Sequence, residues 1–140
     1  MEITTKEALA QLKQELINEM FGGGDCSPDL DKSVTKQGTY QQSSGTFEYT
    51  VEEDGWLTNI SSFPSENTSS IWEVDGYNVI KVQVISVQTS SSGGAYTTFR
   101  IVTSLPFPLK KGSVVRCFVA SQKEMKFRFA PCRGNVNKTN

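Results

Sequence analysis

The chain contains no histidine among its 140 residues, and this absence removes several classes of catalytic site. Serine-histidine-aspartate and cysteine-histidine catalysis, histidine-ligated zinc and the zinc-protease helix motif all require an imidazole. Only three cysteines occur, and no two of them are spaced as Cys-x-x-Cys, so a tetrahedral metal site lacks ligands. We therefore predict no catalytic residue, no metal and no cofactor, and expect that the protein is not an enzyme.

Long apolar runs are missing as well, and no basic stretch followed by an apolar run opens the sequence. We expect no signal peptide and no membrane insertion. The net charge of −1 divides into −7 over residues 1–54 and +6 over residues 55–140. The later bases stand singly between apolar residues, as Lys126 and Arg128 do, which is typical of the solvated face of a strand. Nucleic acid is therefore not expected as a partner, and a basic groove for phosphate is the lesser alternative.

The three cysteines are Cys26, Cys117 and Cys132. Cys117 stands in an apolar, strand-like run and is predicted to be a small buried hydrophobic residue. A bridge between Cys117 and Cys132 is conceivable, but spacing alone does not decide the pairing.

The residues that are abundant favour a β-rich domain. Ser, Thr, Asn and Gln supply 44 of the 140 residues, as suits many turns. From residue 46 onward apolar residues alternate with polar ones, and Asp75-Gly76 between two apolar runs predicts a tight hairpin. A phase slip between Val84 and Ile85 suggests a bulge. The pattern predicts a mainly β protein: an antiparallel jelly roll or β-sandwich of about eight strands with one N-terminal α-helix.

The helix is expected over residues 5–21, where good helix formers precede Gly22-Gly23-Gly24. Its apolar stripe needs a partner, which is either its own domain or copies of itself in a coiled coil. We favour self-association. The predicted oligomerisation residues are Leu9, Leu12, Leu16 and Met20.

These patterns divide the chain into four parts: the anchoring helix at 1–21, a connector at 22–45 with one short strand near residues 39–42, a β domain at 46–131 and a polar tail at 132–140.

Four segments together resemble the fibre-tip domains of phage virions. Residues 49–57 lead from a strand through Asp-Gly to Trp-Leu, and residues 72–79 turn on a second Asp-Gly. Residues 105–115 combine Pro, apolar residues and Lys-Gly before a strand, and residues 127–131 resemble the closing strand. The resemblance implies a jelly roll like that of tumour-necrosis-factor and complement heads, which commonly trimerise behind a helix. By this resemblance the chain would be a homotrimeric head or tail fibre or spike component, assembled in the bacterial cytoplasm and attached to other virion proteins through its helix.

Recognition by such a domain is expected at loops, here residues 61–70 and 89–95. Trp56 and Trp72 lie inside strand-like runs and are more readily explained by packing. A host-cell glycan or protein is the expected ligand, and a carbohydrate-binding module of a bacterial surface system is the alternative function. The candidate ligand-facing residues are Tyr77, Tyr96, Asn67 and Ser91.

Overall fold

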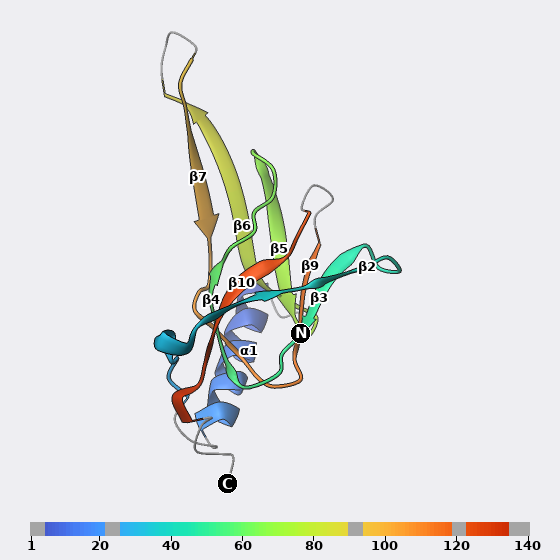
Figure 1. Cartoon of the computed structure of the whole chain (residues 1–140), viewed down its shortest axis with the longest axis vertical. Helices are drawn as coiled ribbons and strands as arrows, with labels where there is room; N and C mark the ends of the chain where they lie inside the picture. The colour runs from blue at the N-terminus through green and yellow to red at the C-terminus, as the bar shows by residue number, and fades with distance from the viewer. Residues whose placement is uncertain (1–4, 22–25, 90–93, 119–122, 135–140) are drawn as a thin grey trace.

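The computed structural model describes residues 5–21, 26–89, 94–118 and 123–134, without the side chains of residues 5, 18–21 and 118. Two antiparallel sheets face each other, and one helix packs beside them (Figure 1). The elements are α1 (Thr5–Phe21), a 3-10 helix (Leu30–Lys32), β1 (Val34–Gln37), β2 (Thr39–Gln41), β3 (Thr46–Thr50), β4 (Gly55–Ile60), β5 (Thr68–Val74), β6 (Tyr77–Gln88), β7 (Tyr96–Val102), β8 (Phe107–Leu109), β9 (Val114–Phe118) and β10 (Lys126–Pro131).

The strand order confirms the predicted fold class. One sheet has the order β1-β10-β4-β8 and the other has the order β2-β3-β9-β5-β6-β7. The chain crosses repeatedly between the sheets, from β3 to β4 to β5 and later from β8 to β9 to β10, which is how a jelly roll is connected. The described residues contain ten strands, two more than expected. The strand expected near residues 39–42 is β2, whereas β1 was not expected because its sequence VTKQ is mostly polar and exposed.

The core lies between the two sheets. Trp72 and Phe127 are fully buried and meet edge to face, with ring centroids 6.0 Å apart. Tyr49 also meets Phe127 edge to face, with a centroid separation of 5.3 Å. Trp72 is therefore a core residue, as its position within a strand predicts.

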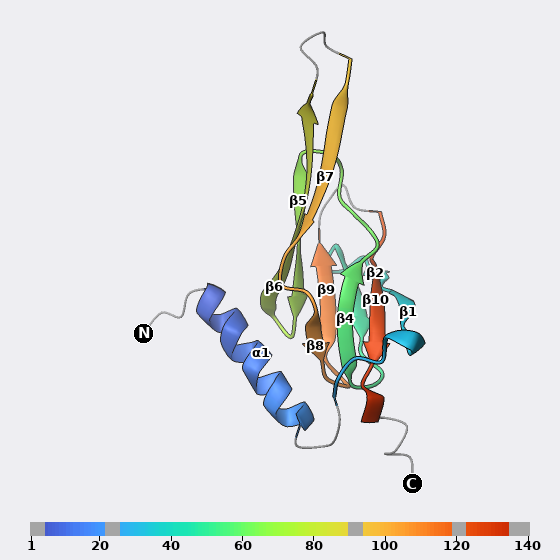
Figure 2. The ribbon, with the colours of Figure 1, turned by 90° about the vertical axis from the view of Figure 1, so that its left-hand side faces the viewer.

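The helix packs on its own domain, which is the alternative to the self-association that we favoured. Leu12 and Leu16 are buried in the same apolar cluster as the strands, and Leu9 packs against that cluster. The helix contacts β6 and β8, one strand from each sheet, on the side away from β1 (Figure 2). β7 pairs with β6 from Val82 onward, which leaves Tyr77 to Ile80 without a partner residue in β7. The stripe of Leu9, Leu12 and Leu16 is therefore covered within one chain and is not free for a coiled coil, while the side chain of Met20 lies outside the described part.

The Asp75-Gly76 hairpin is confirmed. Val74 pairs with Tyr77, and the two turn residues have φ angles of 50° and 87°. The Asp75 carboxylate also accepts a hydrogen bond from the backbone N–H of Val114 at 3.0 Å. Positive φ at both turn positions matches the twist of the flanking strands.

The register irregularity in β6 lies elsewhere than predicted. Val84 and Ile85 pair regularly with Arg100 and Phe99 of β7, so no bulge separates them. The shift instead falls where Trp72 pairs with Ile80 and Glu73 pairs with Asn78, which leaves one extra residue in β6.

The disulfide joins Cys26 to Cys132 across 106 residues, with Cα atoms 4.5 Å apart. The indole of Trp56 packs on this pair and donates a hydrogen bond to the Cys26 carbonyl. The conceivable bridge from Cys132 to Cys117 is thus replaced by one to Cys26, and Cys117 is buried within β9 as predicted. The bond fastens the segment before β1 to the end of β10.

No helix within the described ranges is long and apolar enough to cross a membrane.

Candidate functional site

The far ends of β6 and β7 project from the sandwich as a two-stranded arm (Figure 2). The pairing of β6 with β5 ends at Val84, whereas its pairing with β7 continues to Gln88. From Ile85 to Gln88 the arm therefore consists of two strands only. Isolated two-stranded hairpins are marginally stable in water, so the arm needs stabilising contacts besides the pairing of its two strands.

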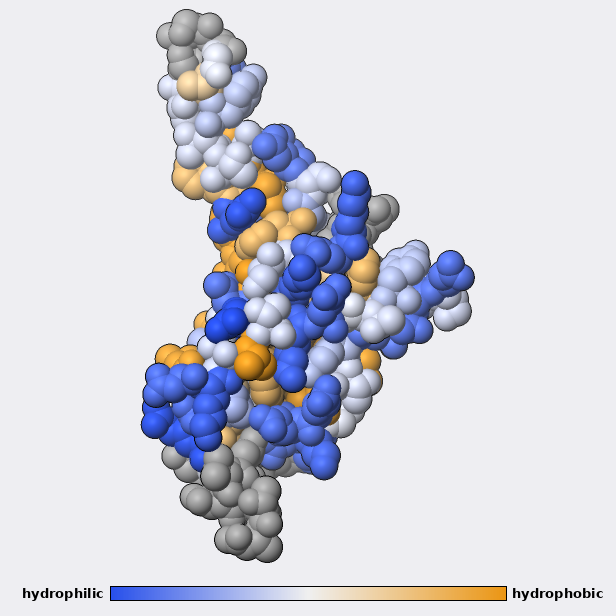
Figure 3. Space-filling model, in the orientation of Figure 1, coloured by the Kyte–Doolittle hydropathy of each residue, from blue (hydrophilic) through white to orange (hydrophobic). Residues whose placement is uncertain are grey.

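One face of the arm is apolar and exposed. Directly paired residues share a face, and every second residue returns to it. By this rule Phe99 lies beside Ile85. The exposed fraction of Phe99 is 50%. Figure 3, which views the molecule from the side of the four-stranded sheet, shows hydrophobic residues along the lower part of the arm, where its inner face joins the core. The face turned away from the four-stranded sheet is called the outer face below. It carries Ile71, Ile85, Val87, Phe99 and Ile101.

The opposite, inner face of the arm begins in the core and becomes polar toward the tip. Val82 and Val84 are buried at its base. Thr98 and Arg100 of β7 follow on the same face, and Tyr96 lies beyond them.

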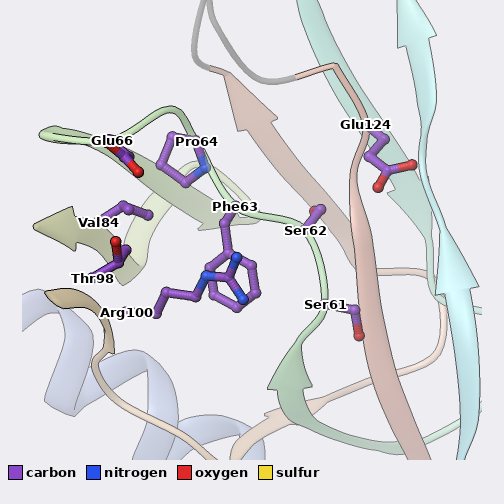
Figure 4. Close-up of a pocket in the computed structure, with 9 residues that line it drawn as sticks. All are labelled: Ser61, Ser62, Phe63, Pro64, Glu66, Val84, Thr98, Arg100 and Glu124. Atoms are coloured by element: carbon purple, nitrogen blue, oxygen red, sulfur yellow. The ribbon is translucent and has the colours of Figure 1, made fainter. Parts of the chain in front are cut away.

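A recess of about 630 Å³ opens against this inner face. Figure 4 shows its walls: Thr98 and Arg100 from β7, Phe63 and Glu66 from the loop after β4, and Glu124 before β10. The volume lies within the range of small-molecule sites, roughly 300–1,000 Å³.

The Arg100 side chain lies flat on the ring of Phe63. Its guanidinium carbon is 4.5 Å from the ring centroid, and Phe63 in turn packs against the core. Such a cation–π contact uses the face of the guanidinium and leaves the N–H donors at its edge available. Arg100 is thereby held in place at the border of the recess.

Asn67 fixes the loop to the arm. Its backbone N–H bonds to the Val84 carbonyl, and its side-chain oxygen accepts from the backbone N–H of Ser86 at 3.1 Å. Its φ of 59° is one that asparagine tolerates better than most residues. Asn67 was predicted to face a ligand; the structure leaves the residue exposed and gives its side-chain oxygen a structural bond.

The side of the recess formed by Ser62 and Glu124 is hydrogen-bonded and ion-paired to Lys126 of β10. The Ser62 hydroxyl accepts a hydrogen bond from the backbone N–H of Lys126 at 2.9 Å. The Lys126 ammonium lies 3.2 Å from the Glu124 carboxylate, which offsets that negative charge at the edge of the recess.

The structure does not bring the predicted ligand-facing tyrosines together. Both Tyr77 and Tyr96 are exposed, as expected of surface residues. Tyr77 begins β6 and Tyr96 pairs with its last residue, so they lie roughly 35 Å apart along one strand. Tyr96 lies at the arm end of this strand pair, on the face of the recess, whereas Tyr77 lies at the far end of β6. Ser91 lies outside the described residues.

Sequence reasoning missed the residues that form the recess. The loop at 61–70 was expected to recognise ligands, and its first half does line the recess. Arg100 carried one signal, because it is a lone charge within the otherwise neutral strand YTTFRIV. Its stacking on Phe63 depends on two segments that are distant in sequence.

No group of three or more metal-ligating side chains occurs among the residues with assigned positions. Comparison of the chain with family models, with curated proteins and with solved structures gives no match.

Proposed function

We propose that this protein is a non-enzymatic component of a phage virion: a homotrimeric head or tail fibre or spike whose β domain decorates the particle or binds the host. The four-segment resemblance suggests this class, and the jelly-roll strand order agrees with it. The proposal places assembly on the arm, because α1 packs within its own domain.

The observation that carries self-association is the outer face of the arm. Phe99, Val87 and Ile101 expose 50%, 45% and 42% of their surface on one face of β6 and β7. Val87 and Phe99 lie where only these two strands pair, and Ile101 follows where β5 joins them. Contiguous exposed apolar residues mark interaction sites, and a third layer would stabilise the hairpin. From Gln83 to Val87 and from Thr97 to Ile101 this face has no charged side chain. Copies of it can therefore meet without like-charge repulsion, which favours a second and third copy of this chain as the occupants.

The solution mass of the purified chain tests this proposal. Light scattering should give three times the 15.5 kDa of one chain. A Phe99→Ser, Ile101→Ser double variant should give a single-chain mass with an unchanged far-ultraviolet circular dichroism spectrum. Thr98→Ser on the inner face of the same strand is the matched control and should remain a trimer. A wild-type chain that is monomeric at all concentrations would overturn the assembly proposal.

The virion assignment needs a separate experiment. Antibodies raised against the purified chain should label intact particles of a phage that encodes it and should reduce adsorption if the domain binds the host. Particles that lack the chain after purification would contradict the assignment.

A carbohydrate-binding module remains the second candidate function, and the recess favours it. Polar side chains with an aromatic ring at one border suit a hydroxylated ligand whether the chain is a trimer or a monomer.

A further inference from the structure

We propose that the recess binds a neutral saccharide, with Thr98, Arg100 and Glu66 forming hydrogen bonds to neighbouring hydroxyls of one sugar ring. This inference deepens the binding part of the proposed function and rests on it for its biological setting. The site itself is formed within one chain and lies on the face of the arm opposite the outer face.

The first support is a set of polar side chains that have no hydrogen-bond or ion-pair partner in the described part of the chain. Among the described residues, no hydrogen bond or ion pair engages the side chains of Ser61, Glu66, Thr98 or Arg100. All four line the recess. Ser62 differs, because its hydroxyl bonds to the backbone of Lys126. The four groups supply carboxylate acceptors, guanidinium donors and two hydroxyls that can do either.

The second support is the balance of charge. Glu124 is paired with Lys126 at 3.2 Å, so Arg100 and Glu66 are the two charges left facing the recess. A phosphate or a strongly acidic ligand would meet the carboxylate of Glu66, and a cationic ligand would meet Arg100. A neutral ligand with several hydroxyls uses both charges without opposing either, and hydrogen bonds to charged groups are worth more than neutral ones.

The third support is the apolar part of the lining. Val84 and Pro64 line the recess next to its polar groups, and Phe63 borders it beneath the Arg100 guanidinium. A pyranose ring has the same division, with C–H groups on its faces and hydroxyls around its edge. Burial of the C–H face contributes affinity, and the hydroxyl contacts set orientation.

The positions of the two strand residues supply a matched pair of variants. Thr97 and Thr98 are neighbours in β7, are both exposed, and point to opposite faces of the arm. Replacement by valine keeps the shape and the β-branch of either residue and removes only the hydroxyl. Thr98→Val should weaken saccharide binding about fivefold to tenfold, the cost of one lost hydrogen bond, whereas Thr97→Val should leave it unchanged.

Arg100→Met keeps a long apolar stem on Phe63 and removes the donors. It should weaken binding by at least about tenfold, since a charged donor is lost. Glu66→Gln keeps the size and one acceptor oxygen and should have a smaller effect of the same direction.

The experiment is a titration followed by the backbone amide resonances of the wild-type chain, with galactose, mannose, glucose and N-acetylglucosamine as separate probes. Glucuronate and glucose 1-phosphate are the anionic comparisons. At least one neutral sugar should shift the amides of residues 61–66 and 98–100 in a saturable way, with the variant pattern given above.

Three results would overturn the inference: no neutral sugar shifts these amides at saturating millimolar concentrations, only the anionic sugars bind, or Thr97→Val and Thr98→Val weaken binding equally. The solution mass of the same samples separates this inference from the assembly proposal. Trimers that bind no sugar would refute the recess alone, and monomers that bind sugar would refute the assembly alone.

Discussion

The two halves of strand β6 have similar composition and opposite surroundings. In the first half the apolar residues are at most 3% exposed, because the four-stranded sheet and α1 cover them. These residues are Val79, Ile80, Val82 and Val84. In the second half Val87 is 45% exposed, because it lies on the outer face, which no other described layer covers. The same kind of residue therefore builds a core in the body and an uncovered surface in the arm.

This contrast explains the change of phase that the sequence shows between Val84 and Ile85. The strand stays regular there, and the apolar positions move from its inner face to its outer face. The apolar side chains of the first half of β6 therefore face the body, and those of the second half face away from it. We expect substitutions in the body to lower the stability of one chain and substitutions in the arm to alter assembly.

The largest effect is expected from Phe127→Ala in the body. Phe127 is fully buried in contact with Trp72 and Tyr49, so truncation leaves a cavity. Urea unfolding should show a loss of about 3–5 kcal/mol. Phe99→Ala removes an equal ring from the outer face and should cost less than about 1 kcal/mol in a dilute monomer. Equal losses for the two variants would mean that the arm is also part of the core.

Leu16→Ala should cost about 2–4 kcal/mol, because Leu16 is 6% exposed and packs in the core cluster. The solution mass should not change, since the helix is bound to its own domain. A variant that dissociates the oligomer at unchanged stability would restore the helix as the assembly element.

Gly76→Val should destabilise the hairpin by about 1–3 kcal/mol. A Cβ at Gly76 would meet no atom within 4 Å, so the cost is that of a φ of 87° in a β-branched residue and not of a clash. Thermal unfolding measures this loss, and Gly76→Asn should recover most of it because asparagine tolerates positive φ. Equal melting of the valine variant and the wild type would show that the turn is not two residues long.

The smallest effect concerns Tyr49 at alkaline pH. Burial raises the pKa of its phenol, the Glu52 carboxylate raises it further, and the Lys36 ammonium opposes the change. The unfolded chain releases this proton near pH 10, below the folded pKa, so stability should fall as the pH rises above about 10. Tyr49→Phe should have a flatter decline in its urea midpoint over that interval. A decline as steep as that of the wild type would assign it to other groups.

Local patterns predicted the elements of the body well. The helix at 5–21 is found with the predicted bounds, and Asp75-Gly76 forms the expected turn. Both depend on neighbouring residues only. Gly55 shows the limit of such reasoning, because it begins β4 against the ring of Phe129 and the carbonyl of Ala130, where a side chain would collide. Its need for glycine comes from residues more than 70 positions away and not from a turn.

What could not be predicted depends on contacts between distant segments. The helix stripe of Leu12 and Leu16 fits both a coiled coil and a sandwich, and only the position of β6 and β8 decides between them. Cys26 and Cys132 meet because β10 ends beside the segment that precedes β1. The residues that line the recess come from four separate segments, so no single sequence motif predicts it.

The central claim is that the arm is completed by other copies of the chain, and amide hydrogen exchange tests it most directly. In concentrated wild-type protein the amides of residues 85–88 and 96–99 should be protected together with those of the body. In the Phe99→Ser, Ile101→Ser variant the arm amides should exchange rapidly while β4, β5 and β10 keep their protection. Rapid exchange of the arm in the wild-type protein at all concentrations would contradict the claim.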